Sequence, residues 1–398
     1  MDKGTIVYIG GFELPDKNAA AHRVLANGKI FRELGYRVIF IGINGSVQID
    51  SGLKNEDFFD FECWSITYPK GSIAWLRYIL GSSYVLNFIN EREQVNKIVG
   101  VVCYNYPAIA QLRIKGLCRK YNIKLISDAT EWYDASAGSL YYRLVKYVDT
   151  TLRMRWVHKV SDGVITTSRY LTDFYNSQKK ITVELPTLFD VARFKAPEIS
   201  KGNSVRRFIY VGSPFDSGRV NKRRTNLKER LDICVDIFYQ LHKAGQKFIF
   251  DIYGITKDEY LKVFPEHTEM LAEMSGFVSI NGRQPNEKVL GHVANADFSI
   301  FFRDQNRVTL AGFPSKLAES ISIGTPVISN TMVSLRSYEK IEGLFLAKRG
   351  EELALVNSLL QLTFNEIDVL KQCAHSSGAF DYRNYSEKVA EFFNKVGV

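Results

Sequence analysis

Residues 311–328 read Ala311-Gly-Phe-Pro-Ser-Lys-Leu-Ala-Glu-Ser-Ile-Ser-Ile-Gly-Thr-Pro-Val-Ile328. Ser315 is a suitable N-cap for a helix, Gly324 is a typical residue for its end, and the proline two positions later cannot continue it. A buried strand is expected at 327–329. A helix that runs into such a strand begins at the edge of the sheet where ligands bind, and its free N–H groups favour a phosphate.

Glu319 lies one turn after Ser315, on the same face of this expected helix. A carboxylate placed there can accept two hydrogen bonds from a ribose diol. The alternative is an ordinary helix with a surface glutamate. The cap, Glu319 and the Gly-Thr-Pro-Val-Ile ending together favour a nucleotide site.

Strand-like and helix-like segments alternate on both sides of a polar stretch at 192–206, which we interpret as a linker. Before it, strands are expected at 6–10, 38–43, 98–104, 124–128, 163–167 and 181–185, with helices at 19–34 and 108–120. After it, strands at 208–212, 248–253, 278–281, 298–302 and 326–330 alternate with helices at 228–244, 286–294 and 316–323. The strands are continuous apolar runs, typical of parallel sheets covered on both faces. The expected fold class is α/β, with two doubly wound Rossmann-like domains facing a central cleft.

A basic loop follows the expected strand at 208–212. Its charged residues are Arg219, Lys222, Arg223, Arg224 and Lys228, against the single acid Asp216. Cations at the carboxyl end of a strand could neutralise a departing diphosphate, although such charge runs are usually solvated. We favour Lys228 and then Arg219 as phosphate contacts, with Ser213 beside them, and solvated positions for most of the others.

Two glycines, Gly10 and Gly11, follow the first expected strand. Paired glycines let a ligand approach the backbone or simply form a turn, and the G-x-G-x-x-G dinucleotide fingerprint is not met. Further along, Asp16, His22 and Arg23 are candidate acceptor contacts.

Asp128 and Glu131 leave the carboxyl end of the strand at 124–128, and Trp132 follows them. Carboxylates in this position could hold sugar hydroxyls or act as a base, and an aromatic ring could stack on a sugar face. The alternative is an acidic turn with buried aromatic residues. Their location favours the functional interpretation.

Charge and composition indicate which kinds of partner and which cell compartment suit this chain. The chain of 398 residues has a formal net charge of +9, which favours anionic partners, but it carries no nucleic-acid-binding motif. It shows no signal peptide and no run of 18 apolar residues, and its five scattered cysteines indicate reduced thiols in the cytoplasm.

The stretch 139–159 has a helical pattern that could lie on a membrane surface. Its apolar positions, such as Leu144 and Trp156, share one face, and Arg143, Lys146 and Arg153 fall on the opposite one. The alternative is a helix that packs its apolar face on the sheet.

Six segments carry a resemblance to a known family. They are Gly10-Gly11, D-A-T-E-W-Y at 128–133, D-G-V-I-T-T-S at 162–168, L-P-T-L-F-D at 185–190, A-D-F-S-I-F-F-R at 296–303 and, above all, 311–328. With these motifs the whole chain resembles the retaining glycosyltransferases of family four, which have the GT-B fold, in the branch that builds capsular and other surface polysaccharides. The resemblance implies an acceptor-binding domain at 1–193, a nucleotide-sugar-binding domain at 205–379, and a last helix at 380–398 packed back on the first domain.

The resemblance also implies residue roles. Glu319 matches the second glutamate of the family's E-x7-E motif, which holds the ribose, whereas the first glutamate falls at Ala311. Donor-sugar recognition would then rest on the backbone amides from Gly312 to Ser315 or on a different side chain, such as Arg307. Phe313, Pro314 and Lys316 are further candidate donor contacts. Lys228 matches the family lysine on the diphosphate, and Asp128 falls where many relatives carry a histidine near the reacting centre.

The resemblance implies transfer with retention, from a nucleotide-diphosphate sugar to a lipid-linked or growing glycan acceptor. Positioning and the charge of Lys228 would supply the catalysis, without a metal ion or a permanently bound cofactor. The expected place is the cytoplasm, including the inner face of the cell membrane. The alternatives are a nucleotide-sugar epimerase, a phosphorylase and a non-catalytic sugar-nucleotide-binding subunit of a polysaccharide assembly complex.

Overall fold

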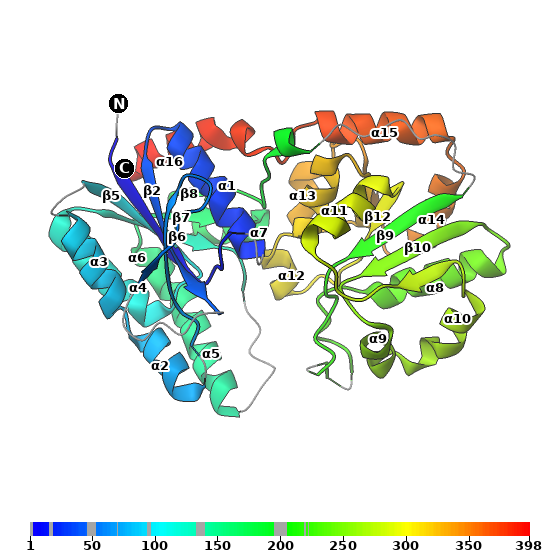
Figure 1. Ribbon diagram of the computed structural model, residues 1–398, viewed down its shortest axis with the longest axis horizontal. Coiled ribbons are helices and arrows are strands. Elements are labelled where there is room, and N and C mark those ends of the chain that lie inside the picture. The colour runs from blue at the N-terminus through cyan, green and yellow to red at the C-terminus, as the bar shows by residue number, and fades with distance from the viewer. Residues whose placement is uncertain are drawn as a thin grey trace. The chain divides into compact units, whose positions relative to one another are not determined.

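The computed structural model describes residues 3–15, 19–45, 53–69, 71–93, 97–132, 140–194, 205–218, 220–221 and 223–398. The chain divides into two compact units, each with its own parallel sheet (Figure 1). The first unit comprises Met1–Phe189, Ala311–Phe313 and Asp381–Val398, and the second comprises Asp190–Leu310 and Pro314–Phe380.

The first unit is built on a sheet with the strand order β3-β4-β2-β1-β5-β6-β7-β8. Its strands are β1 (Thr5–Gly10), β2 (Arg37–Asn44), β3 (Lys54–Asn55), β4 (Glu62–Thr67), β5 (Ile98–Tyr104), β6 (Lys124–Ala129), β7 (Gly163–Thr166) and β8 (Thr182–Glu184). All neighbours pair in parallel except β3 and β4. Without β3, the seven parallel strands follow the doubly wound order 3-2-1-4-5-6-7. Both β3 and β4 were missed from the sequence.

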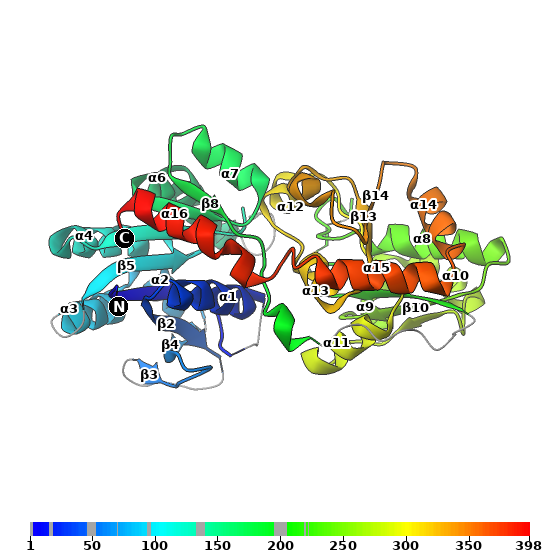
Figure 2. The ribbon, with the colours of Figure 1, turned by 90° about the horizontal axis from the view of Figure 1, so that it is seen from above.

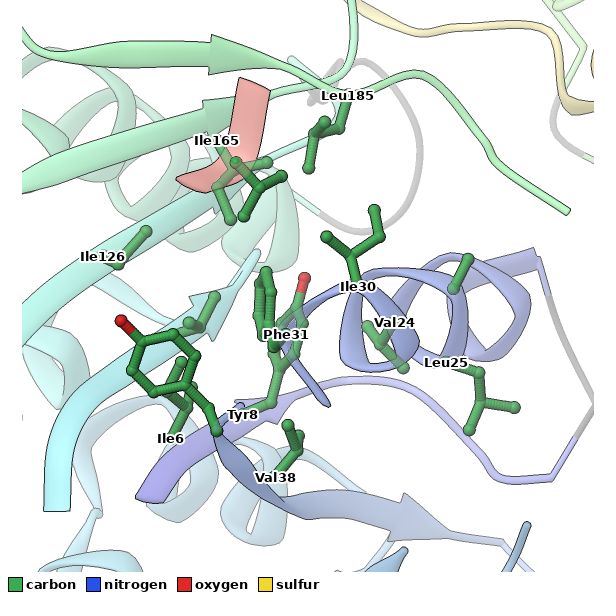
Figure 3. Packing of buried hydrophobic residues seen from close by; sticks show 14 of the residues in the cluster. Ile6, Tyr8, Val24, Leu25, Ile30, Phe31, Val38, Ile126, Ile165 and Leu185 are labelled. Carbon is green, nitrogen blue, oxygen red and sulfur yellow. The ribbon is translucent and has the colours of Figure 1, made fainter. Parts of the chain in front are cut away.

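Helices cover both faces of this sheet. They are α1 (Ala19–Glu33), α2 (Ser72–Leu80), α3 (Ser83–Glu93), α4 (Ala108–Tyr121), α5 (Leu140–Leu152), a π-turn (Arg153–Val157), α6 (His158–Val160), α7 (Arg169–Asn176) and α16 (Ser386–Val396). Alternate side chains of a strand point to opposite faces, so Ile6 and Tyr8 of β1 pack under α1 and α16, whereas Val7 and Ile9 pack under α3 and α4. Figure 3 shows the first of these cores.

The last helix, α16, belongs to the first unit. It packs against α1 and β8 (Figure 2), and the ring of Phe393 lies 5.0 Å from the ring of Phe31. The phenol of Tyr36 donates a hydrogen bond to the carbonyl oxygen of Val398. The chain therefore crosses from the second unit back to the first before it ends.

The second unit has a six-stranded sheet with the order β11-β10-β9-β12-β13-β14, and every pair is parallel. Its strands are β9 (Arg206–Val211), β10 (Phe248–Tyr253), β11 (Val278–Ile280), β12 (Phe298–Ile300), β13 (Val327–Asn330) and β14 (Leu344–Ala347). Its helices are α8 (Leu231–Lys243), α9 (Lys257–Val263), α10 (Thr268–Glu273), α11 (Asn286–Asn295), α12 (Arg307–Ala311), α13 (Ser315–Ile323), α14 (Glu352–Leu360) and α15 (Phe364–Ser376). The strand order is again 3-2-1-4-5-6, so the expected α/β class with two doubly wound Rossmann-like domains is confirmed.

Three local expectations were wrong. Pro314, not Ser315, occupies the N-cap of α13, and no side chain caps that helix. The helix expected from Lys228 begins three residues later, because the N–H groups of Lys228 and Glu229 both donate to the carbonyl oxygen of Pro214. Arg153, expected on a polar outer face, is buried and donates to the carbonyl oxygen of Asn105.

Candidate nucleotide-binding site

The second unit has one point where its strand order reverses, between β9 and β12. The chain proceeds from β9 to β10 on one side, and later returns to place β12 on the other side. Ligands of doubly wound sheets bind beyond the carboxyl ends of the strands at such a point. The segments that leave it are Gly212–Ser213 after β9 and 301–303 after β12, and α13 begins shortly afterwards.

Three charged side chains meet at this edge, and all are buried. Glu229 accepts a hydrogen bond from the guanidinium of Arg303, 2.7 Å away, and is ion-paired with the ammonium group of Lys316. The exposed fractions are 2% for Glu229, 6% for Arg303 and 8% for Lys316. The phenol of Tyr210 also donates to Glu229, and its ring centroid lies 3.9 Å from the Lys316 nitrogen.

The electrostatics of this cluster favour an anion. Burial alone would raise the pKa of Glu229, but the charges of Lys316, Arg303 and Lys228 lower it to about 2. Burial lowers the pKa of Lys316 to about 8, and the positive charges of Arg303 and Lys228 also lower it, although Glu229 opposes them. One carboxylate thus compensates two buried cations, and the exposed Lys228 adds a third positive charge.

A glycine brings the backbone close to this ammonium group. Gly212, directly after β9, has a φ of +121°, and a Cβ built there would lie 3.2 Å from the Lys316 nitrogen. A side chain at this position would be strained and would crowd Lys316. Gly212 therefore keeps the space around the ammonium group free at the carboxyl edge of β9.

Glu319 of α13 is the second feature of this edge. Burial raises the pKa of its carboxyl group to about 7, against the opposing charge of Lys316. Among the residues that the structure describes, none donates a hydrogen bond to this carboxylate. A carboxylate with unused acceptor positions in a weakly solvated place is suited to bind hydroxyl groups, as a ribose diol would require.

The other predicted donor-binding residues of the second unit have different surroundings. Lys228 and Ser213 are both exposed, and the hydroxyl of Ser213 donates to the carbonyl oxygen of Phe215. Arg307 is exposed at the start of α12. Arg219 lies outside the described residues.

Arg224 of the basic loop lies at the surface, where its charge is paired. Its guanidinium is ion-paired with Glu266 and lies 4.5 Å from the ring centroid of Phe264. Arg223 is exposed. Arg224 is therefore engaged in an ion pair within the protein, whereas Arg223 is exposed to solvent.

In the first unit, Asp128 and Arg23 were expected to face substrates, and their surroundings contradict this. Asp128 is fully buried and 2.7 Å from the Arg23 guanidinium. The phenol of Tyr8 donates to Asp128 at 2.5 Å, and Arg23 also donates to the carbonyl oxygen of Leu185 at 2.6 Å. A buried ion pair whose hydrogen bonds are satisfied in this way ties β1, β6 and α1 together, which is a structural role.

Gly10 also has a packing explanation. A Cβ on Gly10 would lie 2.6 Å from the Cβ of Tyr104 on β5, so the close approach of these strand ends requires glycine. Gly11 is exposed, and Glu131 and His22 are partly buried. Asp16 lies outside the described residues.

The remaining predicted donor contacts precede α13. Gly312 and Phe313 are partly buried, Pro314 is buried, and Ser315 is the first residue of the helix. Ala311, at the position of the family glutamate, is fully buried in an apolar cluster of the first unit, and its carbonyl oxygen accepts a hydrogen bond from Ser168.

Sequence reasoning missed Glu229 and Arg303. Arg303 had a usable signal, because it ends the motif A-D-F-S-I-F-F-R directly after a strand. Glu229 had none, since it stands in the charged run Lys-Glu-Arg, where side chains usually face water. Lys316 was predicted to contact the donor sugar-nucleotide, but its ion pair with Glu229 was not predicted.

Comparisons place this geometry among known folds. No family model and no curated protein sequence matches the chain. Solved structures do match along nearly its whole length: sucrose-phosphate synthase from Thermosynechococcus elongatus has a TM-score of 0.68 at 12% identity and covers 99% of both chains. The chain has the GT-B fold.

Two further neighbours share the GT-B fold. The catalytic domain of starch synthase IV from Arabidopsis thaliana, bound to ADP and acarbose, has a TM-score of 0.66 at 12% identity and covers 99% of this chain and 100% of its own. Anabaena HepE in complex with UDP has a TM-score of 0.62 at 13% identity and covers 98% of this chain and 99% of its own.

Two features are absent from the part of the chain that the structure describes. None of the helices described is both long and apolar enough to cross a membrane. Within the same residues, no group of three or more histidine, cysteine, aspartate or glutamate side chains is arranged to hold a metal ion.

Proposed function

We propose that the chain is a glycosyltransferase that takes a sugar from a nucleotide-diphosphate sugar. The observation that carries the proposal is the pairing of two features at the strand-order reversal of the second unit. A buried cationic cluster around Lys316 suits a diphosphate. The carboxylate of Glu319, which accepts no hydrogen bond from the residues that the structure describes, suits a ribose. The HepE complexes with UDP and with UDP-glucose make a uridine nucleotide the first donor to try.

In this proposal Glu319 accepts hydrogen bonds from the ribose, and Lys316, Lys228 and the N-terminus of α13 hold the diphosphate. Lys316 is held by Glu229, so its charge is in place before the ligand arrives. Preorganised cations stabilise the negative charge that develops on a departing diphosphate. Ser213, Arg307 and 312–315 are assigned to the donor by the family resemblance.

Following that resemblance, the transfer retains the configuration of the sugar. The bond from the anomeric carbon to the diphosphate oxygen breaks, and a bond from that carbon to the acceptor oxygen forms on the same face. The acceptor proton passes to the departing phosphate oxygen. No protein base and no metal ion is required, which agrees with the structural role found for Asp128.

We propose a lipid-linked or growing glycan as acceptor, in surface polysaccharide synthesis at the inner face of the membrane. The family resemblance, the net charge of +9 and the helix at 140–152 support this choice. The acceptor would be held by the first unit, where Gly11, Glu131 and His22 retain some exposure.

The test is a calorimetric titration with a panel of nucleotide-diphosphate sugars, followed by product analysis with and without a lipid-linked glycan. Binding of one donor and a product that carries its sugar on the lipid is expected. A sugar isomerised without acceptor would identify an epimerase, and binding without turnover would identify a non-catalytic subunit. Absence of binding to every donor would overturn the proposal.

A further inference from the structure

Large apolar side chains are exposed on one group of helices of the first unit. They include Ile73 of α2, Leu112 of α4, Leu144, Tyr147 and Val148 of α5, and Trp156 of the π-turn that follows α5. Ile73, Leu144 and Trp156 are each more than 60% exposed. An apolar area of this kind on a folded unit indicates a binding surface.

These helices form a single surface. The helix α4 contacts both α2 and α5, and Figure 1 shows the three on the same side of the first sheet. Two hydrogen bonds fix them: Arg113 of α4 donates to the carbonyl oxygen of Leu80 in α2, and the N–H of Ala108 donates to Asp149 of α5. We call this surface, formed by α2, α4, α5, the π-turn and α6, the α2–α4–α5 face.

The exposed charged residues of the α2–α4–α5 face are basic. Its exposed basic residues include Arg77, Arg113, Arg143, Arg155 and Lys159. The single acid in these helical segments is Asp149, which is turned inward to cap α4 and lies 3.9 Å from the buried Arg153. The face therefore combines exposed apolar side chains with an excess of basic over acidic residues.

Exposed apolar side chains together with basic residues favour one binding partner of this face over another. A second copy of the chain would bring basic residues against basic residues, which is repulsive. An anionic bilayer takes the apolar side chains into its interface, attracts the arginines and lysines, and favours Trp156 and Tyr147 at headgroup level.

We propose that the α2–α4–α5 face docks the protein on the surface of an anionic lipid bilayer. The contact extends over three helices rather than the single helix suggested by the sequence pattern. Docking on this face would bring the candidate site to a lipid-linked acceptor. The purpose of the docking therefore rests on the proposed function. The docking itself is measured without nucleotide or acceptor, so it can succeed or fail independently.

The test is sedimentation of the full chain with vesicles of phosphatidylcholine, with or without phosphatidylglycerol. We expect binding to the anionic vesicles, weakened by salt, and at least tenfold weaker binding to the neutral ones. Val148→Glu should lower the partition coefficient by about tenfold or more, since it removes an apolar contact and adds a negative charge. Val369→Glu is the matched control, because Val369 is similarly exposed on α15 of the second unit and should leave binding unchanged.

A second pair of variants tests the charge separately. Arg155→Glu changes the charge by two units and should lower the partition coefficient by about twenty-fivefold, at about fivefold per unit of charge. Arg349→Glu, at an exposed arginine of the second unit, should leave it unchanged. Circular dichroism checks that each variant is folded. Equal binding by wild type, Val148→Glu and Arg155→Glu would overturn the proposal. So would a wild-type dimer that Val148→Glu dissociates, which would assign the face to a second copy.

Discussion

Lys316 and Glu229 form an ion pair in which both side chains are buried, and the pair joins the start of α13 to the loop that precedes α8. Arg303 shares the same carboxylate from the end of β12. Three segments at the carboxyl edge of the second sheet are therefore held by one glutamate. The ammonium group of Lys316 is fixed by the protein and does not depend on the ligand for its position.

The first prediction concerns the stability of this cluster. Glu229→Gln leaves two buried cations without a counter-charge and should cost about 3–5 kcal/mol of unfolding free energy. Lys316→Met should cost much less, because Glu229 keeps its bond to Arg303. Denaturant unfolding followed by fluorescence gives both values.

The double variant Glu229→Gln/Lys316→Met serves as the control. It removes one positive and one negative charge, so it should recover part of the stability lost in Glu229→Gln. A Glu229→Gln protein as stable as the wild type would mean that this carboxylate does not balance the two cations.

The second prediction concerns Glu319. Glu319→Gln keeps the size of the side chain but removes the charged acceptor, and should weaken nucleotide-sugar binding by about 1.5–3 kcal/mol. Calorimetry with the donor found in the titration panel measures this. Glu351→Gln, at an exposed glutamate of the same unit, is the matched control and should bind normally. Unchanged affinity in Glu319→Gln would remove the ribose assignment.

The third prediction concerns Lys228. This residue is exposed, so Lys228→Ala should leave the melting temperature nearly unchanged while it lowers turnover by an order of magnitude or more. Arg223→Ala should affect neither quantity. Arg224→Ala loses the ion pair with Glu266, so a stability loss of up to about 1 kcal/mol with normal turnover is expected. Full activity in Lys228→Ala would leave Lys316 as the principal diphosphate contact.

The fourth prediction concerns metal ions. If fixed cations hold the diphosphate, sugar transfer should continue in excess EDTA at the rate seen without it. Activity lost in EDTA and restored by magnesium or manganese would contradict metal independence. Binding of the donor, measured in the same buffers, separates a metal effect on affinity from one on turnover.

The architecture could be predicted because its signals are local. Continuous apolar runs such as 98–104 identify buried parallel strands, and β5 has those bounds. The strand β4 reads Glu-Cys-Trp-Ser-Ile-Thr, in which polar residues interrupt the apolar run. The π-helical turn at Arg153–Val157 also could not be predicted, because no residue pattern in the sequence indicates it.

The site could be predicted only in part, because the sequence does not show which charges are paired. Asp128 and Lys316 both stand next to strand or helix ends, yet Asp128 is locked in a buried pair with Arg23 from a helix 105 positions away. Glu229 is 87 positions from Lys316, and only the fold brings them together. Long-range pairing of this kind decides which charged residues remain available to a ligand.

The fifth prediction is a bell-shaped pH dependence of donor affinity. Burial raises the pKa of Glu319 to about 7, and the ionised form is the one that accepts both ribose hydrogen bonds, so affinity should rise as pH increases through 7. Burial lowers the pKa of Lys316 to about 8, and only its charged form attracts the diphosphate, so affinity should fall as pH increases through 8.

Between these values both groups carry their binding charge, so affinity should be greatest near pH 7.5 and roughly fivefold lower at pH 6. An intact nucleotide-sugar is the right probe, because its diphosphate is esterified at both ends and does not titrate in this range. Glu319→Gln should flatten the acid limb and keep the alkaline one, whereas Lys316→Arg, which stays charged, should flatten the alkaline limb alone. Calorimetric titrations at half-unit steps of pH resolve the two limbs. If both variants keep the wild-type profile, neither group meets the donor, and the site lies elsewhere in the chain.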